Sequence, residues 1–227
     1  MESVRALCVD TDALVNLLAL DAFDITLKFF ELTRADCFRL RAAEHQVAKA
    51  PWVEKQWPFF DREKALPVVR TLQLLPQSPA IEVLDALNVD GLDEGEAYFL
   101  AALSENPGYL LISGDRRMLE ALHGASDSRL VRVREAVRGR VILFPQIVAA
   151  LVRKLSLQEI ETRIRSGLCK HRTLKILFGS KRPTDPDHFR EAYESELRSL
   201  MSICGEDWLF PLDGSLPRRP GAGFAAR

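Results

Sequence analysis

YLLISGDRRML, residues 109 to 119, combines an uninterrupted apolar run with a carboxylate that follows it closely. The run from Tyr109 to Ile112 is short and rich in strand-forming residues, which predicts a buried strand. The N-terminal stretch VRALCVDTDALVNLLAL, residues 4 to 20, repeats the arrangement, because its apolar residues lead into Asp10. In an α/β fold, ligand sites lie at the carboxyl ends of parallel strands. We therefore expect Asp10 and Asp115 to lie where such a site would form.

Apolar runs and helical periodicity alternate through the first 150 residues. The predicted strands are residues 4–9, 37–40, 109–112 and 141–144, and the clearest predicted helices are 13–20, 22–34, 41–50, 92–106, 116–124 and 146–155. Residues 60–75 predict a helix interrupted at Pro67, residues 81–87 fit a strand or a helix, and residues 131–140 predict a basic connection. Strands that alternate with helices predict an α/β fold with a central parallel sheet and helices on both faces.

The pattern changes beyond residue 150, where only helices are predicted. We expect an α/β domain at residues 1–150, a helical extension at 151–210 and a flexible tail at 211–227. The extension could bind a partner protein, form a homodimer or complete the core of the first domain. Its apolar stretch RTLKILFG, residues 172–179, favours a partner within the same chain.

The charge of the chain is unevenly distributed. Residues 1–115 contain 10 Lys and Arg against 19 Asp and Glu, a net charge of −9, whereas residues 116–227 contain 21 against 13, a net charge of +8. This distribution suits a metal-dependent enzyme that acts on a polyanion. Solvated faces that merely differ in sign would give the same counts.

The composition also narrows the class of protein. The chain is 47% hydrophobic and 28% charged, which is typical of a globular protein. No apolar run approaches the roughly 18 residues of a membrane span, and the N-terminus has no secretory signal pattern. The four cysteines form no CxxC pair, so they indicate neither a disulfide framework nor a zinc site. We expect a cytoplasmic protein with no membrane partner.

Further acids stand at predicted strand ends or in the early turns of helices. They are Asp12, Glu44, Asp93 and Glu96. Clustered carboxylates repel one another unless a cation lies between them, and hard divalent ions such as Mg²⁺ or Mn²⁺ take oxygen ligands. Structural alternatives exist for three of them, because Asp12 can cap a helix, Glu44 can be an exposed helix residue, and Asp93 can complement a helix dipole.

The order of these acids resembles the PIN-domain nucleases, which include the toxin ribonucleases of bacterial toxin–antitoxin pairs. The resemblance is carried by Asp10-Thr11-Asp12, by the acid that opens EAYFLAAL, and by Ser113 and Asp115 in LLISGD, and it covers about residues 4–145. It implies a PIN-like three-layer sandwich and a metal-dependent endoribonuclease that cleaves single-stranded RNA. If the protein is the toxin of such a pair, the resemblance also implies an antitoxin protein as its partner.

The resemblance implies roles for individual residues. The implied catalytic acids are Asp10, Glu44, Glu96 and Asp115. Asp10, Glu96 and Asp115 would hold Mg²⁺ or Mn²⁺, with Asp93 as a rival to Glu96 one turn earlier, while Glu44 would complete the cluster or orient the water. Asp12 and Ser113 would support the site. The residues expected to contact RNA are Arg116, Arg117, Arg132 and Arg134.

Three positions depart from the family pattern. Asp12 replaces the usual Asn, Glu96 stands where Asp is commoner, and Arg117 stands where a further acid often follows. The missing acid would weaken a second metal position. The departures leave open an inactive PIN-like module that binds RNA or a protein without cutting.

A second enzyme class remains as an alternative. CVDTDALV also resembles the strand-Asp-x-Asp motif of haloacid dehalogenase-like phosphatases, in which Asp10 would be the nucleophile and Asp12 an acid or base. SGDRRMLE resembles the later Gly-Asp motif of that class only faintly. The chain lacks the Gly or Ser-Thr pair expected after the second Asp and has no clear Ser/Thr or Lys motif between the two segments.

Overall fold

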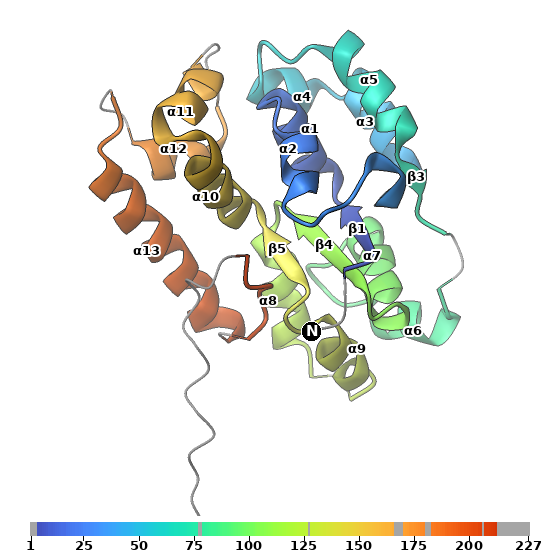
Figure 1. Cartoon of the computed structure of the whole chain (residues 1–227). Helices are drawn as coiled ribbons and strands as arrows, with labels where there is room; N and C mark the ends of the chain where they lie inside the picture. The colour runs from blue at the N-terminus through green and yellow to red at the C-terminus, as the bar shows by residue number, and fades with distance from the viewer. Residues whose placement is uncertain are drawn as a thin grey trace, which may run out of the picture.

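Five parallel strands form the centre of the computed structural model, which describes residues 4–76, 79–126, 128–165, 170–179, 183–205 and 207–212 (Figure 1). The strands are β1 (Ala6–Val9), β2 (Cys37–Arg39), β3 (Gln73–Leu74), β4 (Tyr109–Ser113) and β5 (Val141–Leu143). They lie in the order β3-β2-β1-β4-β5. Helices cover both faces of this sheet, so the predicted three-layer α/β sandwich with C-terminal helices is confirmed.

Helices occupy most of the remaining described residues. They are α1 (Thr11–Ala19), α2 (Phe23–Lys28), α3 (Arg41–Lys49), α4 (Pro51–Gln56), α5 (Arg62–Thr71), α6 (Ile81–Ala86), α7 (Glu94–Glu105), α8 (Arg116–Gly124), α9 (Leu130–Val137), α10 (Phe144–Leu155), α11 (Leu157–Arg165), α12 (Arg172–Phe178) and α13 (Pro186–Cys204), with a 3₁₀ turn at Arg34–Asp36. None of them is long and apolar enough to cross a bilayer within the described residues.

The alternation of side chains along each strand divides the core into two layers. Leu7, Leu110 and Ile112 face helices α1 to α5 and α10 to α12. Cys8 and Leu111 point to the opposite face, where α6 to α9 and the end of α13 cover them. Because both faces of the sheet are buried at its centre, β1 and β5 are apolar at every position, and the run predicted as a buried strand at residues 109–112 lies in β4.

The order of the strands places a topological switch between β1 and β4. The chain leaves β1 toward β2 on one side and leaves β4 toward β5 on the other, while Val9 of β1 pairs with Ile112 of β4. At such a switch the two following helices diverge, and a crevice opens at the carboxyl ends of the strands. The residues that follow β1 and β4 therefore border the same crevice.

The C-terminal helices pack into the core of the first domain. Leu174 and Phe178, from the stretch predicted to find an intramolecular partner, are buried in the same layer as β1 and α1. Leu200 and Trp208 are buried in the opposite layer. The boundary expected at residue 150 lies inside α10, and of the expected tail only residues 211 and 212 lie among the described residues.

A buried polar network joins this extension to α1 and α4. Trp57 donates from Nε1 to Oδ1 of Asn16 at 2.9 Å, and Nδ2 of Asn16 lies 3.0 Å from Nε2 of His171. Because an indole nitrogen can only donate, Oδ1 of Asn16 accepts and its Nδ2 donates to the histidine. His171 is therefore neutral, in agreement with burial, which lowers its pKa to about 4.

The end of the described chain returns to the β5 edge of the sheet. Leu209 forms a bridge with Val141, and the backbone amide of Phe210 donates to the carbonyl of Val141 at 2.8 Å. Nε2 of Gln146 also donates to the carbonyl of Phe210. These bonds occupy backbone groups of an edge strand that would otherwise be open to another chain.

Several segments differ from the sequence predictions. Helix α5 continues through Pro67, which cannot donate to the carbonyl of Glu63, and Glu63 is an exposed residue. The predicted basic connection forms helix α9, because Leu130, Val133 and Val137 recur with helical spacing and are buried. The last residues of the predicted 60–75 helix instead form the short edge strand β3. Residues 81–87, which fitted a strand or a helix, form helix α6 over Ile81–Ala86.

Candidate functional site

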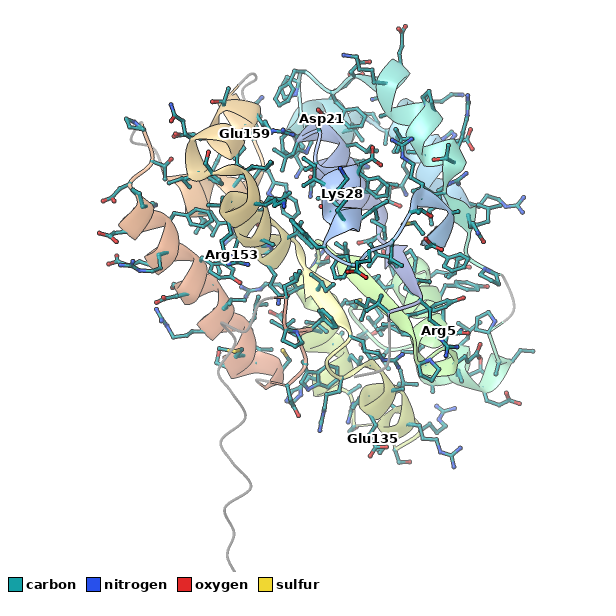
Figure 2. All side chains as sticks on the ribbon, in the orientation of Figure 1. Arg5, Asp21, Lys28, Glu135, Arg153 and Glu159 are labelled. Carbon is teal, nitrogen blue, oxygen red and sulfur yellow. The ribbon has the colours of Figure 1, made fainter. Side chains whose placement is uncertain are left out.

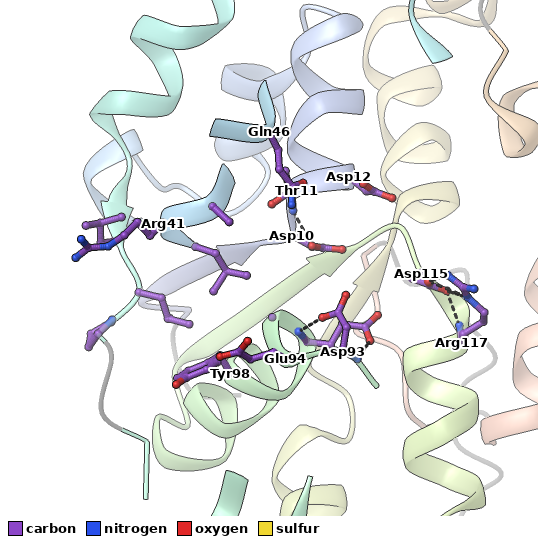
Figure 3. A pocket seen from close by; sticks show the side chains of 17 residues that line it. Asp10, Thr11, Asp12, Arg41, Gln46, Asp93, Glu94, Tyr98, Asp115 and Arg117 are labelled. Atoms are coloured by element: carbon purple, nitrogen blue, oxygen red, sulfur yellow. Dashed lines mark hydrogen bonds and ion pairs between the residues drawn. The ribbon is translucent and has the colours of Figure 1, made fainter. Parts of the chain in front are cut away.

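Three of the helices that begin at the crevice have an aspartate at the N-cap. Asp10 caps α1 after β1, Asp93 caps α7, and Asp115 caps α8 after β4. The amino ends of helices carry partial positive charge, which favours a carboxylate or another anion at this position. Figure 3 shows these three aspartates and Asp12 gathered around one cavity. The two acids that follow predicted buried strands, Asp10 and Asp115, thus line the same cavity.

The cavity has a volume of about 930 Å³. Its acidic lining residues are Asp10, Asp12, Asp93, Glu94, Glu96 and Asp115. Arg117 stands at one end, beside Asp115, while Arg41 and Tyr98 line the other end (Figure 3). The cavity therefore has one end with Asp115 and Arg117 and another end that carries the guanidinium of Arg41 and the ring of Tyr98.

Ser113 connects the two aspartates that follow the sheet. Its side chain is buried, and its Oγ donates to Oδ2 of Asp10 at 3.4 Å. The same Oγ accepts from the backbone amide of Asp115 at 3.1 Å. Oδ1 of Asp10 also accepts from the amide of Thr11 at 2.7 Å. Ser113 therefore links the side chain of Asp10 to the backbone of Asp115.

The electrostatics of the cavity disfavour ionised carboxylates. Burial raises the pKa of Asp10 to about 7, and the charges of Asp12 and Asp93 add to this rise. Burial likewise raises the pKa of Glu96 to about 7, with further contributions from Asp93 and Asp115. The pKa of Asp12 is also raised, first by desolvation and then by the charges of Asp115 and Asp93. A cation in the cavity would relieve this repulsion.

Asp93 and Glu96 bond to each other's backbone. Oδ1 of Asp93 accepts from the amide of Glu96 at 2.8 Å, and Oε2 of Glu96 accepts from the amide of Asp93 at 3.0 Å. This capping box fixes the start of α7 and leaves one carboxylate oxygen of each residue outside the box. The two residues proposed as rivals from the sequence lie together in the cavity.

Asp115 has a different environment from the other acids. Burial alone would raise the pKa of Asp115, but hydrogen bonds and the charge of Arg117 hold it below its usual value. Oδ2 of Asp115 accepts from Nη2 of Arg117 at 2.6 Å, and Oδ1 accepts from the backbone amide of Arg117 at 2.7 Å. Asp115 therefore stays ionised where its neighbours hold protons more tightly.

Glu44 does not join the acids of the cavity. Its Oε1 accepts from Nε of Arg70 at 2.7 Å, and its Oε2 lies 3.4 Å from Nη2 of Arg39. The hydrogen bond from Arg70 lowers the pKa of Glu44. Gln46 lines the cavity from the same helix, and residues two apart on a helix point in nearly opposite directions, about 200° apart. The catalytic position predicted for Glu44 is not supported by its placement.

The structure places only some of the predicted RNA-contacting arginines near the cavity. Arg117 lines the cavity, and Arg116 beside it pairs with Glu120, with Nε 3.0 Å from Oε1. Arg134 donates from Nε to the carbonyl of Leu122 at 2.8 Å, which ties α9 to α8. Helix α9, which also carries Arg132, leads directly into the start of β5 and so lies at the end of the sheet where the strands begin (Figure 1). Glu135 marks this helix in Figure 2. Arg132 and Arg134 are therefore remote from the cavity.

Arg41, Gln46 and Tyr98 line the cavity with polar groups that the sequence did not single out. Arg41 opens α3 just after β2, Gln46 follows on the same helix, and Tyr98 lies on α7 two residues after Glu96. The strand-end argument that singled out Asp10 and Asp115 applies equally to Arg41.

The donors fit a hard divalent cation in their chemistry. The acidic side chains that line the cavity offer carboxylate oxygens, the ligands preferred by Mg²⁺ and Mn²⁺. Within the part of the chain that the structure describes, however, no three His, Cys, Asp or Glu side chains converge closely enough to form a metal-binding group. Asp93 and Glu96 cap each other and Asp115 holds Arg117, so an ion would require a rearrangement of these side chains.

Comparisons with known proteins do not assign the chain to a family. No protein-family model matches the sequence, and neither the curated proteins nor the solved structures contain a significant match. The cavity itself is therefore the basis for any functional proposal.

Proposed function

We propose that the protein is a metal-dependent endoribonuclease that cleaves single-stranded RNA in the cavity at the β1–β4 switch. The observation that carries the proposal is the convergence of Asp10, Asp93 and Asp115 from three helix starts on one cavity. The strand-end motifs that resemble PIN-domain nucleases supply Asp10 and Asp115, and the resemblance gives Asp93 as a rival to Glu96. The toxin role and the antitoxin or homodimer partner, like the cytoplasmic location, rest on that resemblance and on composition alone.

Asp10, Asp115 and one of the pair Asp93 and Glu96 would hold Mg²⁺ or Mn²⁺. When bound, such an ion stabilises the charge of a phosphodiester transition state and lowers the pKa of water. The raised pKa values of Asp10 and Glu96 support this assignment, because carboxylates that repel one another gain most from a shared cation.

The remaining residues of the cavity would position the reacting groups. Ser113 fixes the side chain of Asp10 relative to the backbone of Asp115, because its hydroxyl bonds both. Arg117 can donate to a phosphate oxygen. Arg41 and Tyr98, at the far end of the cavity, offer a charge and a ring to the neighbouring part of an unpaired strand.

A second candidate function is a binding module that has lost catalysis. The pairing of Asp115 with Arg117 and the absence of a converged metal-binding group in the described residues favour it. The phosphatase alternative has less support, because no lysine lines the cavity among the described residues. In addition, a carboxyl with a pKa of about 7 is a poor nucleophile until it is ionised.

Cleavage of a mixed pool of single-stranded RNA tests the proposal. We expect fragments with Mn²⁺ or Mg²⁺ and none with chelator, and Asp115→Asn should reduce the rate by about a hundredfold or more. Asp85→Asn, which removes the same charge from an exposed position on α6, is the matched control and should cut normally. Hydrolysis of a small phosphomonoester without RNA cleavage would instead support the phosphatase. Metal-independent RNA binding without cleavage would support the inactive module.

Glu44→Gln should leave the rate of RNA cleavage within about twofold of the wild-type rate. Its carboxylate pairs with Arg70 and Arg39 rather than pointing into the cavity. The measurement is the initial rate at saturating Mn²⁺, compared with Glu96→Gln, which removes a carboxylate from the cavity itself. A tenfold loss in Glu44→Gln would restore the catalytic role that the resemblance implied.

A further inference from the structure

Arg117 is bound to Asp115 through both its backbone and its side chain. Its Nη2 lies 2.6 Å from Oδ2 of Asp115, its Nε lies 3.0 Å from the same oxygen, and its amide donates to Oδ1 at 2.7 Å. Among the described acids of the cavity, Asp115 alone forms an ion pair. The guanidinium therefore already occupies the carboxylate that the proposed function assigns to a divalent ion.

This ion pair can open at little cost. The side chain of Arg117 is 78% exposed, whereas that of Asp115 is 25% exposed. Exposed ion pairs contribute little to folding stability, because water and salt replace the lost partner. Asp115 is fixed by the N-cap hydrogen bond from the amide of Arg117, so the guanidinium can leave while the carboxylate stays in place.

We propose that Arg117 is an exchangeable counter-ion of Asp115. When substrate binds, the guanidinium leaves Asp115 and pairs with a phosphodiester of the substrate, so that the divalent cation and the substrate bind to the cavity cooperatively. The inference rests on the proposed function and names the regulation of the same site. Without substrate, the guanidinium competes with the metal ion for Asp115. With substrate, a phosphate oxygen accepts from the guanidinium and Asp115 becomes available.

Electrostatics require the competition. A divalent ion held by Asp115 would lie within a few ångströms of a guanidinium that touches the same oxygens, and like charges at that distance repel strongly at a partly buried site. A phosphate offers the guanidinium a second anionic partner with matching geometry. By thermodynamic linkage, if a bound phosphodiester raises the affinity for the metal ion, the bound metal ion must raise the affinity for the phosphodiester by the same factor.

The test is the affinity of the full chain for Mn²⁺, measured by titration calorimetry with and without excess dimethyl phosphate, a minimal phosphodiester. Dimethyl phosphate should tighten Mn²⁺ binding by the wild-type protein. Arg117→Gln should bind Mn²⁺ about tenfold more tightly than wild type without dimethyl phosphate, and the additive should then have no effect. Arg116→Gln is the matched comparison, because it removes the same charge from the adjacent residue, whose side chain pairs with Glu120 instead. The charge of Arg116 also acts on Asp115, but its guanidinium does not occupy that carboxylate, so Arg116→Gln should tighten Mn²⁺ binding much less than Arg117→Gln.

The outcomes separate this inference from the proposed function. If Arg117→Gln and wild type bind Mn²⁺ equally while both cleave RNA, the exchange is wrong and the nuclease remains. If Arg116→Gln tightens Mn²⁺ binding as much as Arg117→Gln does, the change in affinity comes from the net charge near the cavity, and the proposed exchange is also wrong. If no variant binds Mn²⁺, the inference and the metal site fail together.

Discussion

Asp10→Asn is expected to lower the rate of metal-dependent RNA cleavage by about a thousandfold and, in the same protein, to raise the free energy of unfolding by about 2 kcal/mol near pH 8. The loss of rate follows from removing a carboxylate that lines the cavity. The gain in stability follows from burial, which raises the pKa of Asp10 to about 7. Few substitutions are expected to act on function and stability in opposite directions to this extent.

The sign of the stability effect follows from proton binding. In the unfolded chain the carboxyl of Asp10 ionises near 3.8, whereas in the folded protein it ionises near 7. Between these values the folded state holds more protons, so this residue makes the wild-type protein lose stability as pH rises from about 4 to 7. Asparagine does not ionise. The full shift would correspond to about 4 kcal/mol, which we halve because solvent reaches part of the carboxylate.

Urea unfolding of the metal-free protein at several pH values measures this effect. The difference between Asp10→Asn and wild type should be near zero at about pH 4 and reach its maximum above about pH 7. Asp85→Asn is the matched control, because it removes a carboxylate from an exposed position on α6 outside the cavity. It should keep the cleavage rate of the wild type and change the free energy of unfolding by less than about 0.5 kcal/mol. If the difference in free energy of unfolding between Asp10→Asn and wild type did not depend on pH, burial would not raise the pKa of Asp10 in the folded protein.

Asn16→Ala is expected to lower the free energy of unfolding by about 3 kcal/mol. The amide is buried and bonds Trp57 on one side and His171 on the other. Its removal leaves the indole Nε1 and the imidazole Nε2 facing a cavity without the partner that each now has. Urea unfolding near neutral pH gives the value, with Asn88→Ala at an exposed position as the control that should change stability by less than about 0.5 kcal/mol.

Trp57→Phe separates the hydrogen bond from the packing. The ring is largely kept, but Oδ1 of Asn16 loses its donor, so a loss of about 1 to 2 kcal/mol is expected. A loss below about 0.5 kcal/mol in both Asn16→Ala and Trp57→Phe would mean that water replaces the network. That result would contradict the view that these contacts fasten the C-terminal helices to α1.

The sequence was informative wherever the position of a residue depended on chain order alone. Asp10 and Asp115 could be placed together because parallel strands end at the same edge, and Ser113 lies between that edge and Asp115. Asp93 could be placed only as a helix start, since nothing in the sequence showed that α7 begins at the same crevice. The structure supplies that proximity through the packing of α7 against the sheet.

The predictions failed where the direction of a side chain mattered. Glu44 and Gln46 lie on the same short helix, and burial of Ala43 and Val47 decides which of the two polar residues faces the cavity. Arg134 was expected to face RNA because a basic run suggests an exposed connection. Its guanidinium instead reaches the end of α8, since the apolar residues of the run form a helix that packs beneath the sheet.

The contact between Asn16 and His171 also determines when the fold can form during synthesis. The two residues are 155 positions apart. Because a ribosome adds about 5 to 20 residues per second, His171 is synthesised roughly 10 to 30 s after Asn16. During that time the face of the sheet that α12 later covers stays open in the nascent chain. A message cut short before the codon for His171 would therefore yield a product with this apolar face exposed, prone to aggregate or to be captured by chaperones.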